Sequence, residues 1–406
     1  MAESQESPPN FATALRYWLQ LGLVSFGGPA GQIAMMQHDL VDRRRWIGQT
    51  DFLQALNFCM VLPGPEAQQL ATYIGWRLHG VRGALAAGIF FVLPGALVLY
   101  ALSWIAAAHG DTQVVQSIFT GLKPVVIAIV LQALWRIGQR TLINGTTVLL
   151  AVAAFVAVGF LAVPFPAVIV TAGFVGWRLL KSPAAGTVDT PPSPRRAIKL
   201  AALYFVLLVV PVGLVVASAG TEPFLKLAQF FTQAAFVTFG GAYAVLPYVA
   251  RIAVETFHWL SPEEMVNGLA LAETTPGPLI LVLQYVGFFA GWHHGGLRDA
   301  TLGAALTTYV TFLPSIFLIL IGAPYVQWIA GLRGVGAAMS GITAAVVGVV
   351  ATLAWFLGRT VYVVPSGIDI FSIAVTLIAF GVALRWKIPV PWLVLAGAAL
   401  GLLRGL

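Results

Sequence analysis

Charged residues are scarce in this sequence. Its 406 residues include 22 Lys and Arg and 15 Asp and Glu, so 9% are charged, whereas 59% are hydrophobic. A soluble domain carries about 25% charged residues, so a soluble globular enzyme is excluded. The 25 Phe, 12 Trp and 10 Tyr exclude a disordered chain. The composition predicts an all-α polytopic membrane protein, preceded by a disordered tail at residues 1–10.

Cysteine and catalytic signatures are almost missing as well. Cys59 is the single cysteine, which excludes an internal disulfide and a cysteine-based zinc or iron–sulfur site. No Walker A, HExxH, GxSxG or Rossmann pattern occurs, so the sequence indicates no ATP hydrolysis within this chain. The sequence predicts no enzyme, no metal and no cofactor. The net charge of +7 indicates basic cytoplasmic loops rather than nucleic-acid binding.

Long apolar stretches account for most of the chain and predict membrane-spanning helices. They lie at 84–108, 114–135, 145–162, 164–180, 200–219, 300–323, 335–357, 368–384 and 388–404. The polar, proline-rich residues 181–199 predict a cytoplasmic linker between a first repeat at 11–180 and a second at 220–406. The stretch 200–219 is then a connecting transmembrane helix.

An internal repeat is the strongest pattern in the sequence. The motif FGG occurs at 26–28 and 239–241, and PGP occurs at 63–65 and 276–278, both at an offset of 213 residues. Pro94, Gly121, Trp135 and Gly138 recur as Pro314, Gly341, Trp355 and Gly358, at an offset of 220. Gly and Pro together interrupt a helix, so each motif predicts two half-helices joined at a break.

The loop charges predict that the two repeats are inverted. The basic run 43–45 is replaced by 256–258, which contains one His. The uncharged loop 163–166 corresponds to one that carries Arg385 and Lys387. Because Lys and Arg mark cytoplasmic loops, this exchange is typical of halves inserted in opposite directions. The unpaired helix 200–219 supplies the extra crossing that turns the second half over.

Inverted repeats with broken helices are typical of secondary transporters. A half-helix that begins at a break offers free backbone N–H groups and the positive end of its dipole, which favour an anion. Four such starts could converge on one anion. Alternatively, the motifs are only tight turns for close packing. The glycines expected to approach the anion are Gly27, Gly28, Gly64, Gly240, Gly241 and Gly277.

Polar residues near the breaks complete the predicted site, because buried polar groups in a membrane usually have a function. The further substrate-binding candidates are Glu66, Gln68, Gln69, Arg77, Arg82, Tyr243, Thr275 and Gln284. Glu66 could cap its half-helix or carry a proton, and Glu273 is the better candidate for proton coupling. Each Arg could instead extend its charged end to the membrane surface.

Four segments around the breaks resemble the paired motifs of the long-chain chromate transporter family. They are FGGPAGQIAMM, PGPEAQQLATYIGW, FGGAYAVLPYV and TPGPLILVLQYVGF, and the resemblance extends from about Phe11 to Leu406. One departure is Gly31-Gln32, where family members commonly have a His, so a proton role for a His there is in doubt.

The resemblance implies export of chromate, with sulfate as a chemical mimic, across the bacterial inner membrane. The family that the sequence resembles also includes short members, which work as pairs of half-length proteins in opposite orientation. A sulfate or other oxyanion permease is the alternative, and an intramembrane enzyme acting on lipid-linked phosphate is the less favoured one. The expected partners are chromate, sulfate and the lipid bilayer, and a homodimer is left open.

Overall fold

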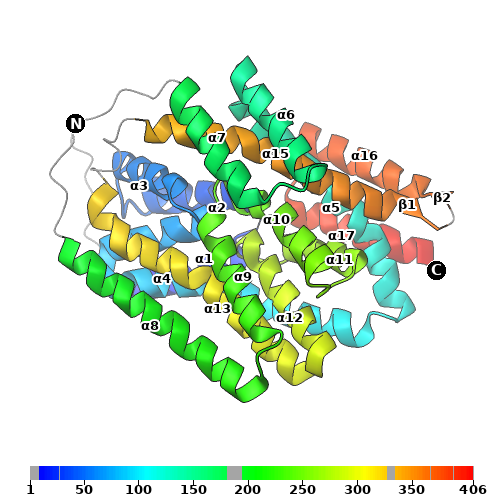
Figure 1. Cartoon of the computed structure of the whole chain (residues 1–406), viewed down its shortest axis with the longest axis horizontal. Helices are drawn as coiled ribbons and strands as arrows, with labels where there is room; N and C mark the ends of the chain where they lie inside the picture. The colour runs from blue at the N-terminus through cyan, green and yellow to red at the C-terminus, as the bar shows by residue number, and fades with distance from the viewer. Residues whose placement is uncertain are drawn as a thin grey trace.

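The computed structural model describes residues 9–26, 28–180, 194–326, 334–365, 367–386 and 388–405. These residues form helices in almost every segment, and their one sheet is a two-stranded hairpin (Figure 1). Residues 1–8 of the tail expected at 1–10, Gly27 and residues 181–193 of the linker lie outside the described residues.

The first repeat contains seven α-helices and one π-helix in its described residues. They are α1 (Phe11–Val24), α2 (Gly28–Gln37), η1 (His38–Arg43), α3 (Gln49–Val61), α4 (Glu66–His109), α5 (Gln113–Thr141), α6 (Gly145–Gly159) and α7 (Phe165–Leu179). Non-helical torsions at His79 and Gly80 divide α4 into a short and a long segment. The connecting helix α8 (Pro194–Ala219) begins six residues before the expected position, because Arg195, Arg196 and Lys199 belong to its first turns.

The second repeat has the same order of elements. It contains α9 (Phe224–Val237), α10 (Ala242–Arg251), η2 (Ile252–Thr256), α11 (Pro262–Thr274), η3 (Leu279–Leu281), α12 (Val282–Gly295), α13 (Leu297–Gly322), η4 (Ala323–Tyr325), α15 (Val335–Tyr362), β1 (Val363–Val364), β2 (Gly367–Ile368), α16 (Ile370–Trp386) and α17 (Val390–Gly405). Thus α9 to α12 correspond to α1 to the short segment of α4. The helices α13, α15, α16 and α17 correspond to the long segment of α4 and to α5, α6 and α7.

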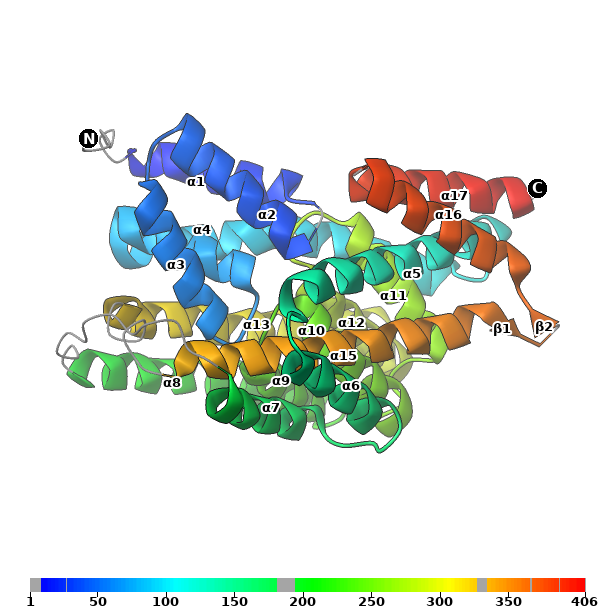
Figure 2. The same ribbon diagram turned by 90° about the horizontal axis from the view of Figure 1, so that it is seen from above.

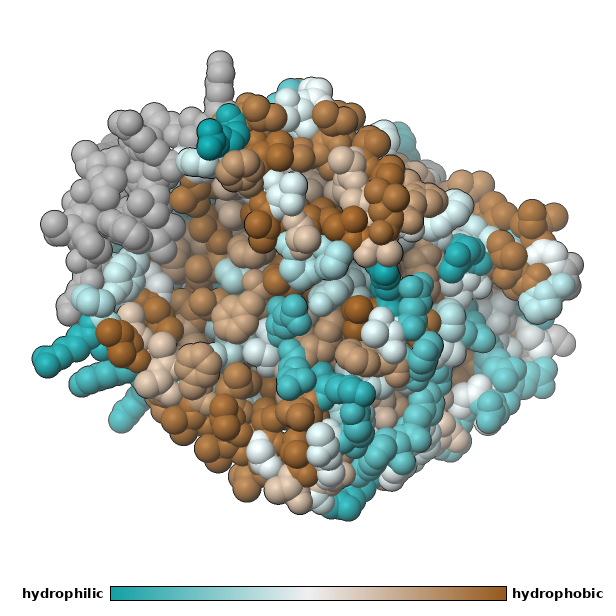
Figure 3. All heavy atoms as spheres, in the orientation of Figure 1, coloured by the Kyte–Doolittle hydropathy of each residue, from teal (hydrophilic) through white to brown (hydrophobic). Residues whose placement is uncertain are grey.

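The apolar stretches become long helices whose outer surface remains apolar. Five described helices are long and apolar enough to cross a membrane: α4, α5, α8, the segment Leu297–Tyr325 and α15. Helix α8 has a single buried residue, Tyr204, and exposes Phe205, Val209 and Leu214. Figure 3 shows apolar residues along α8 and α7 on this face, with hydrophilic residues at its left edge and in a band from its centre to its lower right. An apolar surface of this extent is suited to lipid, as expected for a polytopic membrane protein.

Both kinds of motif interrupt helices, as the sequence predicts. The backbone φ angle is positive at the described glycines of all four motifs: +72° at Gly28, +126° at Gly64, +75° at Gly240, +93° at Gly241 and +92° at Gly277. Side chains rarely tolerate this region of φ, so glycine supplies the turn that ends each first half-helix. The fold class predicted from the sequence is therefore confirmed, including its discontinuous helices.

The two repeats are interleaved rather than placed side by side. Helix α5 of the first repeat packs against α16 and α17 of the second, and α15 of the second packs against α6 and α7 of the first (Figure 2). Helices α5 and α15 also pack against each other. Small residues permit these contacts, since a methyl group on Gly176 would lie 2.8 Å from Gly341 Cα. Each repeat therefore depends on the other for its helix packing.

Candidate functional site at the helix breaks

The PGP break of each repeat meets the FGG break of the other. The backbone N–H of Gly64 donates a hydrogen bond to the carbonyl of Thr238 (2.7 Å), directly before the second FGG. In the same way, the N–H of Gly277 donates to the carbonyl of Ser25 (2.9 Å), directly before the first FGG. We call the contact around Gly64 the first crossing and the contact around Gly277 the second crossing. The motifs therefore meet in two pairs, and the N–H groups of Gly64 and Gly277 are already hydrogen-bonded.

Two neighbouring glutamines at the start of α4 line the first crossing. The Nε2 of Gln69 donates to the carbonyl of Pro63 (2.7 Å), which closes the turn. Gln68 is fully buried, yet neither polar atom of its side chain has a hydrogen-bond partner among the described residues. Leaving a buried polar group without a partner costs about 1–3 kcal/mol. Gln68 therefore keeps an unused donor and acceptor in the protein interior.

The amide side chains at the second crossing are used differently. The Nε2 of Gln32 donates to the carbonyls of Gly277 (2.6 Å) and Ser25 (3.1 Å), so it connects the two motifs. The Nε2 of Gln284 donates to the carbonyl of Ala96 in α4 (2.9 Å). Gln32 belongs to the stretch Gly31-Gln32, where the resemblance described above implies a His. Here its amide NH2 group, which has two protons to donate, binds the backbone at both motifs.

The expected proton carrier Glu273 is linked to another candidate, Tyr243. The Tyr243 hydroxyl donates to Glu273 Oε1 (2.7 Å), and Glu273 is buried at the end of α11. This contact joins α10 to α11. Thr275, another candidate, donates back to the carbonyl of Ala272 (3.0 Å). The sequence singled out these residues separately, and the pairing of Tyr243 with Glu273 appears only in three dimensions.

Glu66 occupies the first turn of α4 at the first crossing and is partly buried. One hypothesis was that its side chain caps the half-helix. Helix α4 has no side-chain cap, and the carboxylate of Glu66 makes no hydrogen bond or ion pair with any described residue. It therefore does not cap the half-helix in this conformation, and proton carriage by Glu66 stays a prediction.

Arg77 and Arg82 lie apart from the crossings. Arg77 is exposed near the end of the short segment of α4 and pairs with Asp51 (2.8 Å). Arg82 is also exposed, at the start of the long segment. Nine residues separate Gln68 from Arg77, which is roughly 13 Å along a helix. The structure therefore brings Gln68 and Gln69 together at the first crossing but does not bring these arginines to it.

Three hydroxyl residues of α13 were not singled out from the sequence. Thr307, Thr311 and Ser315 follow one another at intervals of four residues and are at most 1% exposed. None of their hydroxyl groups has a partner within the described part of the chain. A methyl group on Gly64 would lie 2.6 Å from Ser315 Oγ and 2.7 Å from Gln69 Nε2, so Ser315 faces the first crossing. The four-residue spacing in an apolar helix was the available signal.

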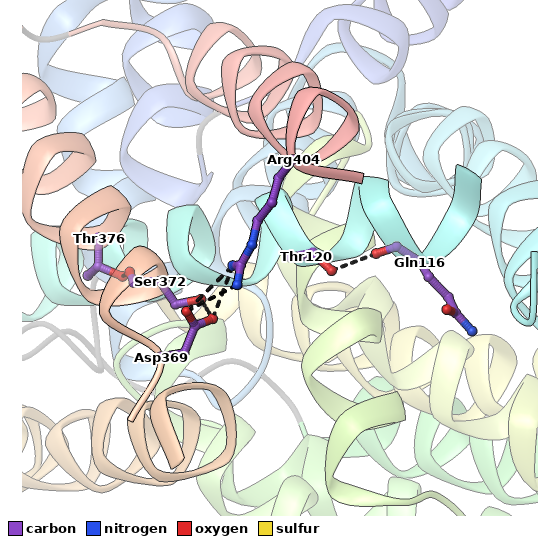
Figure 4. Close-up of polar contacts among 6 residues, drawn as sticks. All are labelled: Gln116, Thr120, Asp369, Ser372, Thr376 and Arg404. Atoms are coloured by element: carbon purple, nitrogen blue, oxygen red, sulfur yellow. Dashed lines mark hydrogen bonds and ion pairs between the residues drawn. The ribbon is translucent and has the colours of Figure 1, made fainter. Parts of the chain in front are cut away.

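A separate cavity of about 260 Å³ lies beside the β1–β2 hairpin. Its polar lining includes Thr120, Lys123, Glu263, Asp369 and Ser372. Lys123 pairs with Glu263. Asp369 accepts a hydrogen bond from Ser372 (2.7 Å) and pairs with Arg404 (3.3 Å), as Figure 4 shows. The acidic lining residues are thus paired with cations. Within the described residues, no group of three or more His, Cys, Asp and Glu could hold a metal ion.

Comparison with known proteins identifies the family. The family model described as chromate transporter matches residues 12–177 and again 225–402. A chromate transport protein of Cupriavidus metallidurans is 30% identical over 95% of this chain and 90% of its own. One of Pseudomonas aeruginosa is 31% identical over 98% of this chain and 94% of its own.

Shorter relatives match one part of the chain. An uncharacterized transporter of Bacillus subtilis is 27% identical over 30% of this chain and 63% of its own. No solved structure matches. The family model covers both repeats, and each match includes one FGG and one PGP motif. The chain is therefore a multi-pass membrane protein that belongs to the chromate transporter family.

Proposed function

We propose that this protein is a secondary transporter that exports chromate across the bacterial inner membrane. Sulfate is proposed as an alternative or exchanged oxyanion, and the membrane potential, proton antiport or both as the driving force. In this proposal the 181–199 linker lies in the cytoplasm. The observation that carries the proposal is the meeting of helix breaks from two interleaved repeats, with uncharged polar side chains buried between them.

The chemistry of the crossings supports an oxyanion as the substrate. Chromate and sulfate are tetrahedral dianions with four acceptor oxygens, and amide and hydroxyl groups can donate to them without a metal. Gln68 and Ser315 offer donors with no partner among the described residues. The start of α4 adds the positive end of a helix dipole. Hydrogen bonds to a charged group contribute about 1.5–3 kcal/mol each, so a few such donors suffice for specific binding.

The membrane potential supports outward movement. Moving one elementary charge across 100 mV changes its free energy by about 2.3 kcal/mol, so a dianion leaving a negative interior gains roughly 4–5 kcal/mol. Uptake of the same ion would have to overcome this amount through several co-transported cations. Export therefore requires no further energy source, and proton antiport through Glu273 would add to it.

Uptake of labelled chromate into inside-out membrane vesicles tests the proposal directly. Vesicles containing the protein should accumulate chromate when their lumen is positive, and an imposed pH gradient should change the rate if protons are exchanged. Control vesicles carry a Gly277→Val variant, in which a branched side chain at φ +92° would disrupt the second crossing. Equal accumulation in both kinds of vesicle would contradict transport through this fold.

Two alternatives predict other outcomes. An inward oxyanion permease would accumulate labelled sulfate in right-side-out vesicles and would make cells more sensitive to chromate. An intramembrane enzyme acting on lipid-linked phosphate would leave chromate sensitivity unchanged. Growth of cells with and without the protein at rising chromate concentration separates these alternatives from export, which predicts protection.

A further inference from the structure

The two crossings are pseudo-equivalent in backbone but not in side chains. At an offset of 213 residues, Gln68 and Gln69 of the first crossing correspond to Leu281 and Val282 of the second. At an offset of 220, Thr307, Thr311 and Ser315 of α13 correspond to residues of α4, namely Ala87, Phe91 and Gly95. The first crossing is therefore polar where the second is apolar or small.

The corresponding contacts confirm this difference at atomic detail. A methyl group on Gly64 would meet the polar atoms Ser315 Oγ and Gln69 Nε2, at 2.6 and 2.7 Å. A methyl group on the equivalent Gly277 would meet Leu281 Cδ1 at 3.2 Å, Gly95 Cα at 3.6 Å and the backbone carbonyl oxygen of Phe91 at 3.7 Å, but no polar side-chain atom. The amide N–H groups of the second crossing, on Gln32 and Gln284, donate to backbone carbonyls. Their amide oxygens have no partner among the described residues, and neither has the Ser25 hydroxyl. Amide oxygens are acceptors and cannot bind an anion, so the second crossing offers fewer free donors than the first.

Three hydroxyl groups of α13 lack the hydrogen bond that other hydroxyl groups of the same helix make. Thr301 and Thr308 donate to the carbonyls four residues earlier, Leu297 and Ala304, both at 2.8 Å. Serine and threonine residues in helices commonly bond in this way. Thr307, Thr311 and Ser315 do not, although they are buried. Eight residues of helix separate the first from the last, so the three hydroxyls extend over roughly 12 Å.

Gln68 lies beside α13, close to the residue that follows Ser315. A methyl group on Gly88 would lie 3.0 Å from Gln68 Nε2 and 3.3 Å from Ile316 Cγ1. Gln68 and Ser315 therefore border the interface between α4 and α13 at the first crossing. Thr307 instead faces α12, since a methyl group on Gly287 would collide with Thr307 Oγ1. In the described conformation the interface at the first crossing is closed, and its donors have no partner among the described residues, which makes the closed contact unfavourable.

We propose that Thr311, Ser315 and Gln68 form the oxyanion-binding face of the transport path. The interface between α4 and α13 at the first crossing opens to expose this face, while the second crossing stays packed. This inference rests on the proposed transport of an oxyanion and assigns its binding residues. The three side chains are uncharged, so they offer donors to a dianion without holding it by a fixed opposite charge. Such binding suits release on the far side.

Substitutions that remove only the hydroxyl test the binding role. Thr311→Val, Ser315→Ala and the double variant are compared with Thr308→Val, whose hydroxyl is bonded to its own helix. We expect each single variant to raise the KM for chromate in inside-out vesicles about tenfold, since each loses a donor to a charged ligand. Thr308→Val should keep the wild-type KM. Thermal stability should stay equal or rise, because a buried group without a partner is removed.

The outcomes separate this inference from the proposed function. If the wild type transports chromate and the double variant keeps its KM, the assigned face is wrong while chromate transport stands. If the wild type transports neither chromate nor sulfate and neither ion raises its melting temperature, both proposals are wrong. If an ion stabilises the wild type without transport, loss of that stabilisation in the double variant supports the binding face alone.

A pair of equivalent cysteines tests which crossing opens. Thr311→Cys and Phe91→Cys are made in a Cys59→Ser background, since both native side chains are buried at equivalent positions. During chromate transport, a small membrane-permeant thiol reagent should label position 311 at least severalfold faster than position 91. Equal rates at the two positions, or faster labelling at 91, would overturn the assignment of the opening to the first crossing.

Discussion

The glycines of the breaks illustrate how single residues determine the fold. Gly241 precedes α10 with φ +93° and ψ 170°, a region that is almost restricted to glycine. A methyl group there would meet no atom within 4 Å, so the cost of a side chain comes from the backbone alone. Gly64 combines a φ of +126° with close neighbours, and a side chain there would be disfavoured on both grounds.

Gly241→Ala therefore isolates the backbone contribution. We expect it to destabilise the protein by about 1–3 kcal/mol and to reduce transport, as measured by thermal unfolding in detergent and by vesicle uptake. Gly213→Ala in α8 is the matched control, because it also meets no atom within 4 Å and its φ is not positive. If both variants unfold at the same temperature, the positive φ of Gly241 is not a constraint on stability.

The carboxylates of Glu66 and Glu273, which lie at the helix breaks, should differ in their effect on transport. In Glu273→Gln the amide oxygen can still accept the hydrogen bond from Tyr243, so the geometry is kept while the titratable group is lost. We expect this variant to transport chromate at a rate that no longer depends on pH. Glu66→Gln should instead keep the pH profile, because Glu273 is the expected proton carrier. Rates measured between pH 6 and pH 8 test both expectations.

An unchanged pH profile in Glu273→Gln would exclude proton coupling through this residue. Export driven by the membrane potential alone would then be the better account. Tyr243→Phe serves as the control for packing, because it removes the hydrogen bond to Glu273 but leaves the carboxylate in place.

At the scale of helices, each short half-helix after PGP is tied to its neighbour by one ion pair. Arg77 at the end of the short segment of α4 pairs with Asp51 of α3 (2.8 Å). His293 at the end of α12 pairs with Glu264 of α11 (3.1 Å). Asp51 and Glu264 are equivalent at the offset of 213. The cation of this ion pair is therefore a permanently charged Arg in the first repeat and a titratable His in the second.

These two tethers should respond differently to pH. The hydrogen bond with Glu264 raises the pKa of His293 above its usual value. Partial burial raises the pKa of Glu264, but the hydrogen bonds from His293 and Ser261 outweigh it and lower the pKa below its usual value. The contribution of His293 is present below its unfolded-state pKa and is lost as the pH rises through its raised pKa. That of Glu264 is lost as the pH falls through its lowered pKa.

We therefore expect Glu264→Gln to lower the melting temperature at pH 6 by roughly 1 °C, a small effect because the pair is partly exposed. The decrease should be smaller at pH 8, because less of His293 is charged there. Asp51→Asn, which breaks the equivalent pair with Arg77, should have the same effect at both pH values. The nearby pair of His294 and Asp299 (2.7 Å) is unchanged in both variants, so it cancels in the comparison. A Glu264→Gln effect that does not vary with pH would contradict this assignment.

The elements also show what could be predicted from sequence. Apolar length and the Gly–Pro motifs are local signals, so the breaks and the second set of helices were expected correctly. The pairing of Gly64 with Thr238 joins distant segments, and no local pattern contains it. The start of α8 was misplaced because Arg195 and Arg196 were assigned to a polar linker, although basic residues are common at the membrane-facing end of a helix.

The candidate site was predictable to a similar extent. Gln68, Gln69, Tyr243 and Glu273 were recognised as polar residues in apolar surroundings, and the structure places them at or near the breaks. Arg77 and Arg82 were included as cations near PGP, yet the helix carries them to the exposed end. Thr307 and Thr311 resemble ordinary helix residues in a sequence. Their unused hydroxyls become apparent only when burial and partners are known.

At the scale of the whole molecule, the inverted repeat makes a prediction about sidedness. Arg43 and Thr256 are equivalent and exposed, at the ends of η1 and η2, which follow α2 and α10. Cysteines introduced there in a Cys59→Ser background should react from opposite sides of the membrane, position 43 from the cytoplasm and position 256 from outside. Labelling of intact cells with an impermeant reagent measures this. Reaction of both positions from the same side would contradict the inversion.

The interleaving of the repeats also has a consequence for biosynthesis. Helix α5 leaves the ribosome long before α16 and α17, which are its packing partners. During that interval the newly inserted first half must wait in the bilayer with its future contacts covered only by lipid. A chain that stops after α15 would leave the side of α5 that packs against α16 and α17 permanently exposed to lipid. Such a chain would be a substrate for membrane proteases. Because α16 and α17 are synthesised last, the nascent protein becomes resistant to degradation only when these two helices are complete.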